Sequence, residues 1–379
     1  MATEINTKEK QKKFTILLLS APIGSGHRLA AQALQQVLEQ KADVEVIHGN
    51  VFSFFPEFLG SAFLRSYLWV LARCPWVYRA AYAWGNKKSG SLWLRSLVNK
   101  ALAFLGRGYL SRVNPDAVIA THATPAGIMG IYKRSHPGML LSAVITDFTI
   151  HRWWLNDGVD YYFIADKLLQ DKLPADVCAL PMGIPVRQEF VKISRTSTAD
   201  LRRSLNWPQN KKICLLMGGG EGLLPMQKII AALKKQQIDN LEIVAVTGNN
   251  HKLLHNLQSA YGSCGDVRLY GFTQEVPAMM GSADMIVTKA GGLTAAEVLA
   301  TGLSFIIYHP LPGQEEGNAM FLEKHAGAVI AHTSSQVAGF VQQFAADDAA
   351  KKTEKQQCCG KPMAADDICN FILNKLEKN

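Results

Sequence analysis

The sequence predicts an α/β protein made of two Rossmann-like domains, each a parallel sheet wrapped by helices. Short apolar runs alternate with helical stretches in both halves of the chain, which is typical of βαβ units. The alternation pauses at PMGIPVRQEF (181–190) and then starts again. The chain of 379 residues is also longer than a domain with a single hydrophobic core usually is. Because ligands collect at the carboxyl ends of parallel strands, we expect one in the cleft between the two domains.

The expected strands are short and apolar. In the first half they cover residues 14–20, 43–48, 116–121, 140–146 and 161–165. In the second half they cover residues 212–220, 242–248, 267–272, 283–288 and 303–309. After the first strand, Leu29, Ala33, Val37 and Leu38 recur at helical spacing. A polar stretch near 346–362 precedes a closing amphipathic helix at 363–377. We therefore divide the chain into domains at 1–182 and 183–345, followed by a linker and helix at 346–379.

The bulk composition is that of a globular protein with an excess of positive charge. The chain is 48% hydrophobic and 19% charged, with a net charge of +9 that favours acidic partners such as a nucleotide, anionic lipid or nucleic acid. Its seven cysteines have no CxxC spacing, so neither a disulfide framework nor a zinc site is indicated and a reducing cytoplasm fits best. No apolar run reaches the roughly 18 residues of a membrane span.

An insert at residues 52–110 interrupts the alternation. It holds four of the seven tryptophans and eight Lys/Arg residues against the single acid Glu57. Aromatic and basic side chains interleaved in this way are typical of a segment at a membrane interface. A helical hairpin packed on its own domain is the plainer alternative. Single-stranded nucleic acid is a third, weakened by the absence of an RNA-binding motif. The residues we assign to this surface are Arg65, Trp69, Arg73 and Trp76.

The first glycine loop lies in SAPIGSGHRLAA (20–31), between an expected strand and an expected helix. Its Gly24 and Gly26 lack the spacing of a dinucleotide fingerprint, and no Gly-Lys-Ser/Thr follows, so neither NAD nor P-loop chemistry is supported. We expect these glycines to make room for an acceptor headgroup, with His27 at the cleft. A tight turn before a helix that begins near a histidine is the plainer alternative.

Three further loops follow strands of the second half. The amides of Gly218, Gly219 and Gly220 could face an anion, although a close turn would need the same glycines. Gly291 and Gly292 precede a helix that carries Glu297 one turn in. That carboxylate could accept bonds from both hydroxyls of a ribose, or it could simply interact with the helix dipole. The loop after the last strand offers an amide and two carboxylates for the hydroxyls of a sugar: Gln314, Glu315 and Glu316.

These loops belong to segments that resemble a known family. GFTQEVPAMMGSADMIVTKAGGLTAAEVLATGLSFIIYHPLPGQEEGNA (271–319) resembles the nucleotide-sugar domain of the family 28 glycosyltransferases, which have the GT-B fold. SAPIGSGHRLAAQAL (20–34), VITDFTIHRWWLNDGVDYYFIA (144–165) and PMGIPV (181–186) are similar to motifs of its other domain. Within the family the likeness is greatest to monogalactosyldiacylglycerol synthases and processive diacylglycerol glucosyltransferases. It spans roughly residues 14–345.

The resemblance implies a UDP-sugar site in the second domain. There Phe272 and Thr273 would contact the uracil, and Glu297 would hold the ribose. The loops Gly218–Gly220 and Gly291–Gly292 would face the diphosphate. Gln314, Glu315 and Asn318 match positions that touch the sugar or support its loop. The UDP-sugar is a substrate, and we expect neither a cofactor nor a metal, because no DxD-type pair lies in a suitable loop.

The resemblance also implies an acceptor site in the first domain. His27 matches the histidine assigned as general base, and its ordinary pKa near 6.5 suits that task. Asp147 is the competing base, or it orients the histidine. His151 and Trp154 match a segment that lines the acceptor side, and the insert occupies the place of the family's membrane-docking region.

The expected activity is inverting transfer of a hexose from UDP-hexose to diacylglycerol, or to glycosyl-diacylglycerol, on the cytoplasmic face of a membrane. Anionic membrane lipids are expected partners, and no specific nucleic acid is. One alternative is transfer from UDP-GlcNAc to a polyprenyl-diphosphate lipid. Another is a lipid- or nucleic-acid-binding protein without activity, which would predict loss of the donor residues. The sequence does not distinguish glucose from galactose, nor does it settle processivity.

Overall fold

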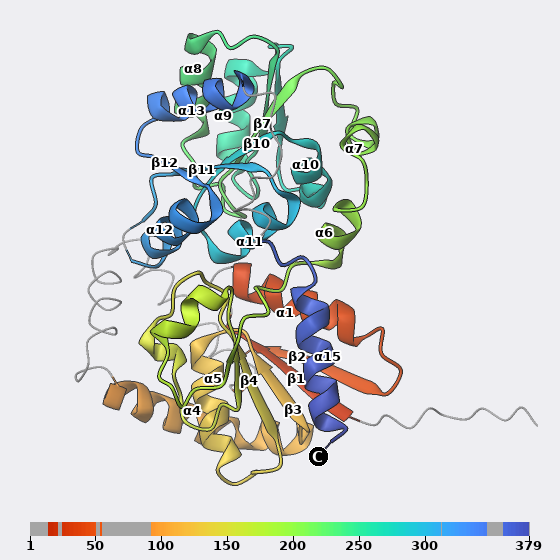
Figure 1. Ribbon diagram of the computed structural model, residues 1–379, viewed down its shortest axis with the longest axis vertical. Helices are drawn as coiled ribbons and strands as arrows, with labels where there is room; N and C mark the ends of the chain where they lie inside the picture. The colour runs from red at the N-terminus through yellow and green to blue at the C-terminus, as the bar shows by residue number, and fades with distance from the viewer. Residues whose placement is uncertain are drawn as a thin grey trace, which may run out of the picture.

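The computed structural model describes residues 14–21, 25–50, 54, 92–311, 313–346 and 359–378. Within them the strands form two separate six-stranded sheets, and every strand pairing is parallel. Figure 1 shows the first sheet in the lower half of the molecule and the second above it. The predicted fold class, two Rossmann-like domains of parallel sheet and helix, is therefore confirmed.

The first sheet has the strand order β2-β1-β3-β4-β5-β6. Its strand β1, between β2 and β3, reads FTILLLS, and residues 16–19 are fully buried. A continuous apolar run of this kind is expected where helices cover both faces of a parallel sheet. The strands are β1 (Phe14–Ser20), β2 (Val44–Asn50), β3 (Ala117–Ala120), β4 (Leu140–Val144), β5 (Tyr161–Phe163) and β6 (Ala179–Leu180).

Alternate residues of β1 pack against helices on opposite faces. Ile16 and Leu18 lie in a core with α1 (Ser25–Leu38) and α15 (Ala364–Leu376). Leu17 and Leu19 lie in a second core with α4 (Leu92–Val113) and α5 (Ala123–Lys133). The period of two along a strand produces this division. Two short 3-10 helices complete the described part of this domain: η2 (Arg152–Trp154) and η3 (Lys167–Lys172).

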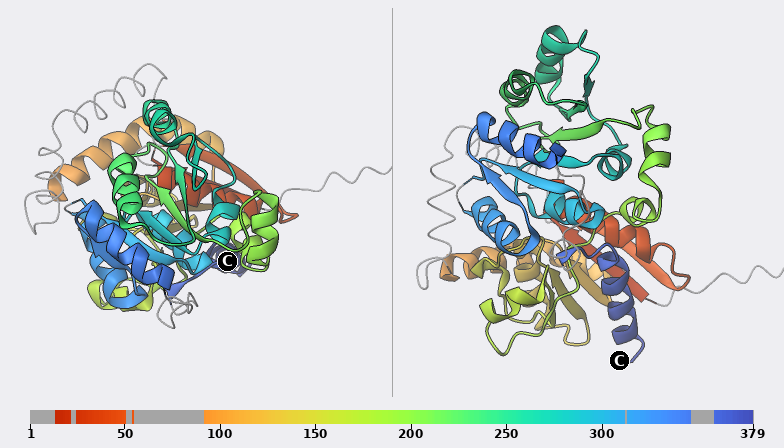
Figure 2. Two further views of the ribbon diagram at one scale, coloured as in Figure 1. Left: turned by 90° about the horizontal axis from the view of Figure 1, so that it is seen from above. Right: turned by 45° about the horizontal axis from the view of Figure 1, so that its top comes forward.

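The closing helix returns to the first sheet. α15 follows the second domain in sequence, but Ile368, Cys369 and Ile372 are fully buried beside α1 and the first sheet. Figures 1 and 2 show α15 next to α1, far from the second sheet. A helix was expected at residues 363–377, but its docking site could not be read from the sequence. The first domain is thus built from two distant parts of the chain.

The second sheet has the order β12-β11-β10-β7-β8-β9, the order of a dinucleotide-binding fold. Its strands are β7 (Lys212–Met217), β8 (Leu241–Val246), β9 (Val267–Tyr270), β10 (Met285–Thr288), β11 (Ser304–Tyr308) and β12 (Val329–Ala331). Its helices are α6 (Gln188–Ile193), α7 (Thr198–Ser204), α8 (Met226–Gln236), α9 (His251–Tyr261), α10 (Val276–Ser282), α11 (Gly292–Thr301), α12 (Gln314–Ala326) and α13 (Ser334–Ala346).

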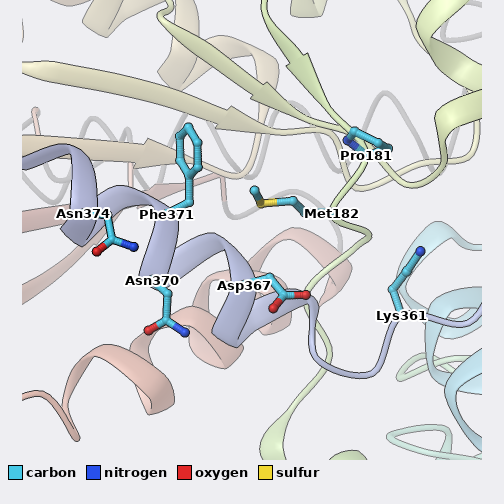
Figure 3. A pocket seen from close by; sticks show the side chains of 7 residues that line it. All are labelled: Pro181, Met182, Lys361, Asp367, Asn370, Phe371 and Asn374. Atoms are coloured by element: carbon cyan, nitrogen blue, oxygen red, sulfur yellow. The ribbon is translucent and has the colours of Figure 1, made fainter.

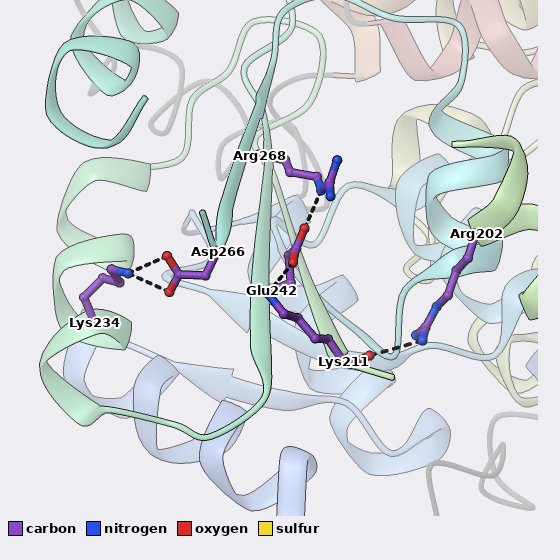
Figure 4. Close-up of polar contacts among 6 residues, drawn as sticks. All are labelled: Arg202, Lys211, Lys234, Glu242, Asp266 and Arg268. Atoms are coloured by element: carbon purple, nitrogen blue, oxygen red, sulfur yellow. Dashed lines mark hydrogen bonds and ion pairs between the residues drawn. The ribbon is translucent and has the colours of Figure 1, made fainter. Parts of the chain in front are cut away.

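Charged side chains gather at the amino ends of these strands. Glu242, almost fully buried near the start of β8, accepts from Lys211 at 2.9 Å and also pairs with Arg268 (Figure 4). Nearby, Arg202 pairs with Asp284 at 2.7 Å. A buried carboxylate needs such partners, because desolvating an unpaired charge is expensive. This edge of the sheet is therefore a structural ion-pair network, and the opposite edge carries the glycine loops.

Candidate active site

The candidate site lies where the carboxyl ends of the two sheets face each other. In each sheet the strand order reverses there, between β1 and β3 in the first domain and between β7 and β10 in the second. Loops that diverge at such a point leave room for a ligand. Helix α1 packs on α11 across the boundary, as Figure 1 shows. The glycine loops singled out in the sequence therefore come from both domains to one region.

His27, in the first turn of α1, has a fixed ring orientation. Its Nδ1 donates to the carbonyl oxygen of Thr121 at 2.8 Å and lies 2.7 Å from the hydroxyl of Thr146. A carbonyl oxygen only accepts, so Nδ1 carries the proton and Nε2 keeps its lone pair. Burial lowers the pKa of His27, while Asp147 and the Thr121 carbonyl act to raise it. The ring is therefore neutral near pH 7 and able to take a proton at Nε2.

A second histidine, His122, lies against the first. Its ring packs edge-on to the ring of His27, with centroids 4.8 Å apart. Its Nδ1 accepts from the amide of Thr124 at 3.1 Å. Burial, and then the neighbouring His27, lower the pKa of His122 to about 3. This ring stays uncharged, so it shapes the site without competing for protons. Sequence reasoning missed it, although it directly follows an expected strand, the position that drew attention to the other loops.

Asp147 connects the two domains. Its carboxylate accepts from the side-chain amide of Gln314 at 2.5 Å and from that of Asn318 at 3.1 Å, both on α12. Asn318 is fully buried and also accepts from the amide of Phe148 at 2.9 Å. Both oxygens of Asp147 are thus held by amide groups of the second domain. This arrangement suits a carboxylate that supplies a fixed negative charge to the site. It suits a proton-transferring base less well.

The loop that carries Asp147 lies directly on the start of α11. A Cβ placed on Gly292 would stand 1.9 Å from the carbonyl oxygen of Thr146, so only glycine permits this approach. A Cβ placed on Gly26 would stand 3.5 Å from the Cβ of Leu293, an ordinary contact distance. The two predicted glycines Gly26 and Gly292 therefore lie on facing sides of the interdomain contact, and Gly291 is the N-cap of α11.

Glu297 is a buried carboxyl on α11 with an incomplete set of partners. Its Oε1 lies 3.5 Å from the guanidinium of Arg187, at the start of α6, but within the described residues it has no hydrogen-bond donor. Burial raises the pKa of Glu297 to about 7, against a lowering effect of Arg187. A donor such as a ligand hydroxyl would satisfy this oxygen and favour its ionised form. Arg187 was not singled out from the sequence.

The remaining donor-side residues surround the carboxyl ends of β7, β9 and β11. Gly219 has a left-handed backbone, with φ of 72°, and a Cβ on Gly219 or Gly220 would meet only open space. Phe272 is 67% exposed, and the hydroxyl of the neighbouring Thr273 accepts from the amide of Glu275 at 3.0 Å. An exposed ring of this size is available to stack on a planar ligand.

Glu315 is held at the start of α12. It accepts from the amide of Leu311 at 3.1 Å and lies 3.8 Å from the ammonium of Lys289. Its carboxylate is therefore partly neutralised in the place where a sugar was expected. The ion pair between Lys289 and Glu315 therefore connects the loop after β10 with the first turn of α12.

The acceptor-side residues are placed in part. His151 caps η2 by accepting from the amide of Trp153 at 3.2 Å, and the buried ring of Trp154 lies 6.3 Å from the ring of His122. Five predicted residues fall outside the described residues: Gly24, Arg65, Trp69, Arg73 and Trp76. No helix in the described part of the chain has the length and apolar character needed to cross a membrane.

A separate cavity of about 400 Å³ lies away from these residues (Figure 3). It is bounded by the linker residues Pro181 and Met182 and by one face of α15, including Asn370 and Phe371. None of the predicted site residues lines it. We therefore assign it no part in the chemistry.

Two family models match the chain, one over each domain. The model described as monogalactosyldiacylglycerol (MGDG) synthase matches residues 27–186. The model described as glycosyltransferase family 28 C-terminal domain matches residues 213–364. The first match begins at His27 and ends at Val186, the last residue of GIPV (183–186). Both domains therefore agree with the resemblance found in the motifs.

Whole-chain relatives carry the same assignment. A processive diacylglycerol beta-glucosyltransferase of Bacillus cereus (strain G9842) is 28% identical over 342 residues, covering 88% of this chain and 86% of the relative. That of Bacillus thuringiensis (strain Al Hakam) is 28% identical over 378 residues, covering 96% and 95%. Among solved structures, Acinetobacter baumannii MurG superposes with a TM-score of 0.64 at 16% identity, covering 95% of this chain and 99% of that one. This last likeness shows the GT-B fold alone.

Proposed function

We propose that this chain, which belongs to glycosyltransferase family 28, moves a hexose from a UDP-sugar to diacylglycerol with inversion at the anomeric carbon. The relatives that span nearly its whole length are diacylglycerol glucosyltransferases. The observation that carries the mechanism is His27, a neutral imidazole with its tautomer fixed at the boundary between the domains. A buried, uncharged base in that place is what attack by an alcohol requires.

The reaction would proceed by a single displacement. Nε2 of His27 takes the proton of the acceptor hydroxyl as that oxygen bonds to the anomeric carbon. The bond from this carbon to the diphosphate breaks at the same time, and the sugar passes through an oxocarbenium-like state. The carboxylate of Asp147, which acts to raise the pKa of His27, stabilises the imidazolium that forms. Asp147 thereby acts on the base and does not replace it.

The donor would be held by the second domain. Glu297 accepts from the ribose hydroxyls, and the exposed ring of Phe272, with Thr273, meets the uracil. The amides of the Gly218–Gly220 loop and the amino end of α11 face the diphosphate, where they can stabilise the charge of departing UDP. Gln314 and Glu315 lie closest to the hexose, and Asn318 supports them from behind. We propose that no metal takes part; a chelator would then leave the rate unchanged.

An anionic lipid surface would be the second partner, on the cytoplasmic face of the membrane. The helix α4 carries no acidic residue, and one of its faces exposes Trp93, Leu97 and Phe104 at 63%, 56% and 66%. Lys100 and Arg107 lie on the same stripe, and the Arg107 guanidinium stands 5.3 Å from the centre of the Phe104 ring. Aromatic rings beside basic groups match the headgroup region of an anionic bilayer.

The activity is tested by offering purified protein UDP-glucose, UDP-galactose and UDP-GlcNAc, each with diacylglycerol vesicles or with a polyprenyl diphosphate. We expect hexosyl-diacylglycerol, identified by mass, from one of the first two donors, formed about 10³-fold more slowly by His27→Ala. Products on the polyprenyl diphosphate alone would replace diacylglycerol as the acceptor. Absence of any glycolipid from folded, UDP-binding protein would overturn the proposal.

The lipid surface is tested separately by vesicle sedimentation. Reversing the charges of Lys100 and Arg107 to Glu should weaken binding to anionic vesicles by at least about 30-fold, because each of the two basic groups near such a surface contributes about 1 kcal/mol. Lys228→Glu with Lys235→Glu, two exposed reversals on α8 of the other domain, is the matched control. Equal binding of both variants would contradict this role of α4.

A further inference from the structure

Helix α4 has a second face that turns inward, opposite the exposed stripe. Asn99 and Ala103 are each 5% exposed and Leu110 is fully buried, all at helical spacing from the partly buried Arg95. The stripe of Trp93, Leu97 and Phe104 therefore shares one rigid rod with a row of residues that faces the domain interior. A displacement of one face must displace the other.

Arg95 is the charged member of the inward row, and it binds the turn around η2. Its Nη1 donates to the carbonyl oxygens of Leu155, Arg152 and Trp153 at 3.0, 3.2 and 3.3 Å. Bonds from a guanidinium to three converging carbonyls are charge-assisted and geometrically demanding. The turn at residues 151–155 is thus attached to α4 by one side chain.

The same turn lies next to the catalytic histidine. Trp154 contacts the ring of His122, which in turn packs on His27. A few residues upstream, Asp147 is held by Gln314 of the second domain. The segment from Asp147 to Leu155 is therefore fixed at one end by the donor domain and at the other by α4.

We propose that Arg95 is a positioning residue that ties the His151–Leu155 turn to α4, so that seating of the exposed stripe on a lipid surface orders the acceptor side of the site. The inference rests on the proposed function, because it concerns how the same acceptor reaches the same base. Arg95 touches neither substrate nor His27. It acts through the backbone of the turn and through Trp154.

Two of the three carbonyls that Arg95 binds keep another donor, so its removal would leave only the carbonyl of Leu155 without a partner among the described residues. The carbonyl of Arg152 also accepts from the amide of Leu155 at 3.1 Å, and that of Trp153 from the side chain of Asn156 at 2.9 Å. The Nε of Arg95 is buried with no hydrogen-bond partner in the described part of the chain. Burial lowers the pKa of Arg95, against the raising effects of Tyr162 and Asp157. An apolar side chain of similar length can replace such a partly satisfied cation at small cost.

The kinetic test compares Arg95→Met, Arg95→Lys and Arg112→Met on diacylglycerol vesicles. Arg112 lies on the same helix and is exposed, and its one hydrogen bond to a described residue goes to the carbonyl oxygen of Gly108 in its own helix, so it is the matched control. We expect Arg95→Met to lower kcat/KM for the lipid about 10- to 100-fold, since a shift of about 1 Å near the reacting atoms has that effect. KM for the UDP-sugar and sedimentation with vesicles should not change. Arg95→Lys should recover part of the loss, because an ammonium can still donate to the carbonyls.

A second readout does not depend on activity. Amide hydrogen exchange of residues 151–156 should slow when anionic vesicles are added to the wild-type protein and to Arg112→Met, but not to Arg95→Met. The protected amides are those of Trp154 and Leu155, which donate within the turn at 3.0 and 3.1 Å. Exchange unaffected by vesicles in the wild type would overturn the coupling even if the transferase is active. If Arg95→Met raised KM for the UDP-sugar and KM for the lipid equally and also lowered the Tm, Arg95 would be a structural residue and not a positioning residue. If the wild-type protein formed no glycolipid but still showed the vesicle-dependent slowing of exchange, the proposed function would be refuted and the coupling through Arg95 would stand.

Discussion

The two sides of the site are built in different ways. On the second-domain side, short stretches that directly follow β7, β10 and β11 supply whole loops, with glycines that shape the backbone. On the first-domain side, side chains converge from distant positions: His27, Thr121, Thr146 and Arg95. A loop that is local in sequence can be recognised from its motif, whereas a converging set becomes visible only after folding.

The two sides also differ in charge. On the first-domain side, burial lowers the pKa of His27 and of His122, so both rings are uncharged near pH 7. Burial raises the pKa of Glu297 on the other side, so its charge changes in the same range. On the first-domain side, His27 can therefore receive a proton. On the second-domain side, Glu297 can gain a hydrogen-bond donor. The following variants test this division.

Replacing the base should have the largest effect. His27→Ala should lower the rate of transfer about 10³-fold, since general-base catalysis contributes about 10²–10⁴-fold. UDP binding, measured by calorimetry, should be unchanged because His27 belongs to the first-domain side. His255→Ala, at an exposed position on α9, is the control. A parallel loss of UDP affinity would mean that the two sides are not separable.

Neutralising Asp147 should have the next largest effect. Asp147→Asn removes the charge that stabilises the imidazolium, and we expect transfer to fall about a hundredfold. Because the carboxylate acts to raise the pKa of His27, the acid limb of the kcat/KM profile should move to lower pH. The profile is measured between pH 4.5 and 8. An acid limb that vanishes, with a loss as large as that of His27→Ala, would make Asp147 the base.

On the second-domain side, Glu297→Gln should weaken UDP binding about tenfold, the usual scale for a hydrogen bond to a charged group. In the wild type, UDP affinity should rise as pH increases through about 7, because the ionised carboxylate is the better acceptor. Titration calorimetry at pH 6 and 8 should find no such rise in the variant.

The same carboxyl should affect stability with the opposite sign. Its folded-state pKa of about 7 lies above the ordinary value of 4.5, so the folded state binds its proton more tightly. The contribution of this carboxyl to stability is then greatest below pH 4.5 and is lost as the pH rises through about 7. Glu297→Gln should therefore melt at a higher temperature than the wild type at pH 8. A lower Tm at pH 8 would show that the ion pair with Arg187 outweighs burial.

The smallest effect concerns the glycine loop after β7. A methyl group on Gly220 meets open space, so Gly220→Ala should fold normally and weaken UDP-sugar binding a few-fold, by crowding the diphosphate. Gly222 has φ of 59°, and its Cβ would stand 2.2 Å from the carbonyl of Thr247, so Gly222→Ala should lower the Tm instead. If Gly220→Ala bound the UDP-sugar as tightly as the wild type, the loop would be a tight turn that does not contact the diphosphate.

Much of the fold could be predicted from periodicity. The first strand lies at the expected residues 14–20, because a fully apolar run between polar ends has one sensible interpretation. The strands β6 and β12 were missed: two and three residues are too few to show a period. The expected strand at 140–146 ends two residues early, because Thr146 and Asp147 turn toward His27 and α12.

The candidate site could be predicted where chemistry and position coincide in sequence. Glu297 and Gln314 lie near the starts of helices that follow strands β10 and β11, and His27 lies in the first turn of the helix that follows β1. Thr121, Thr146, Arg187 and Arg95 carry no such signal, since their roles depend on which loop faces which. A hydroxyl beside an imidazole, or an arginine beneath a turn, is a property of the tertiary structure.

The return of α15 to the first sheet has a consequence for biosynthesis. Ribosomal synthesis releases the chain from its amino end, and domains usually fold as they emerge. The face of the first sheet that holds Ile16 and Leu18 is completed only by Ile368 and Ile372, after residues 212–346 have been made. The second domain can therefore fold before the first is finished. The domain that carries the apolar stripe of α4 thus reaches its final packing only after the second domain has been made.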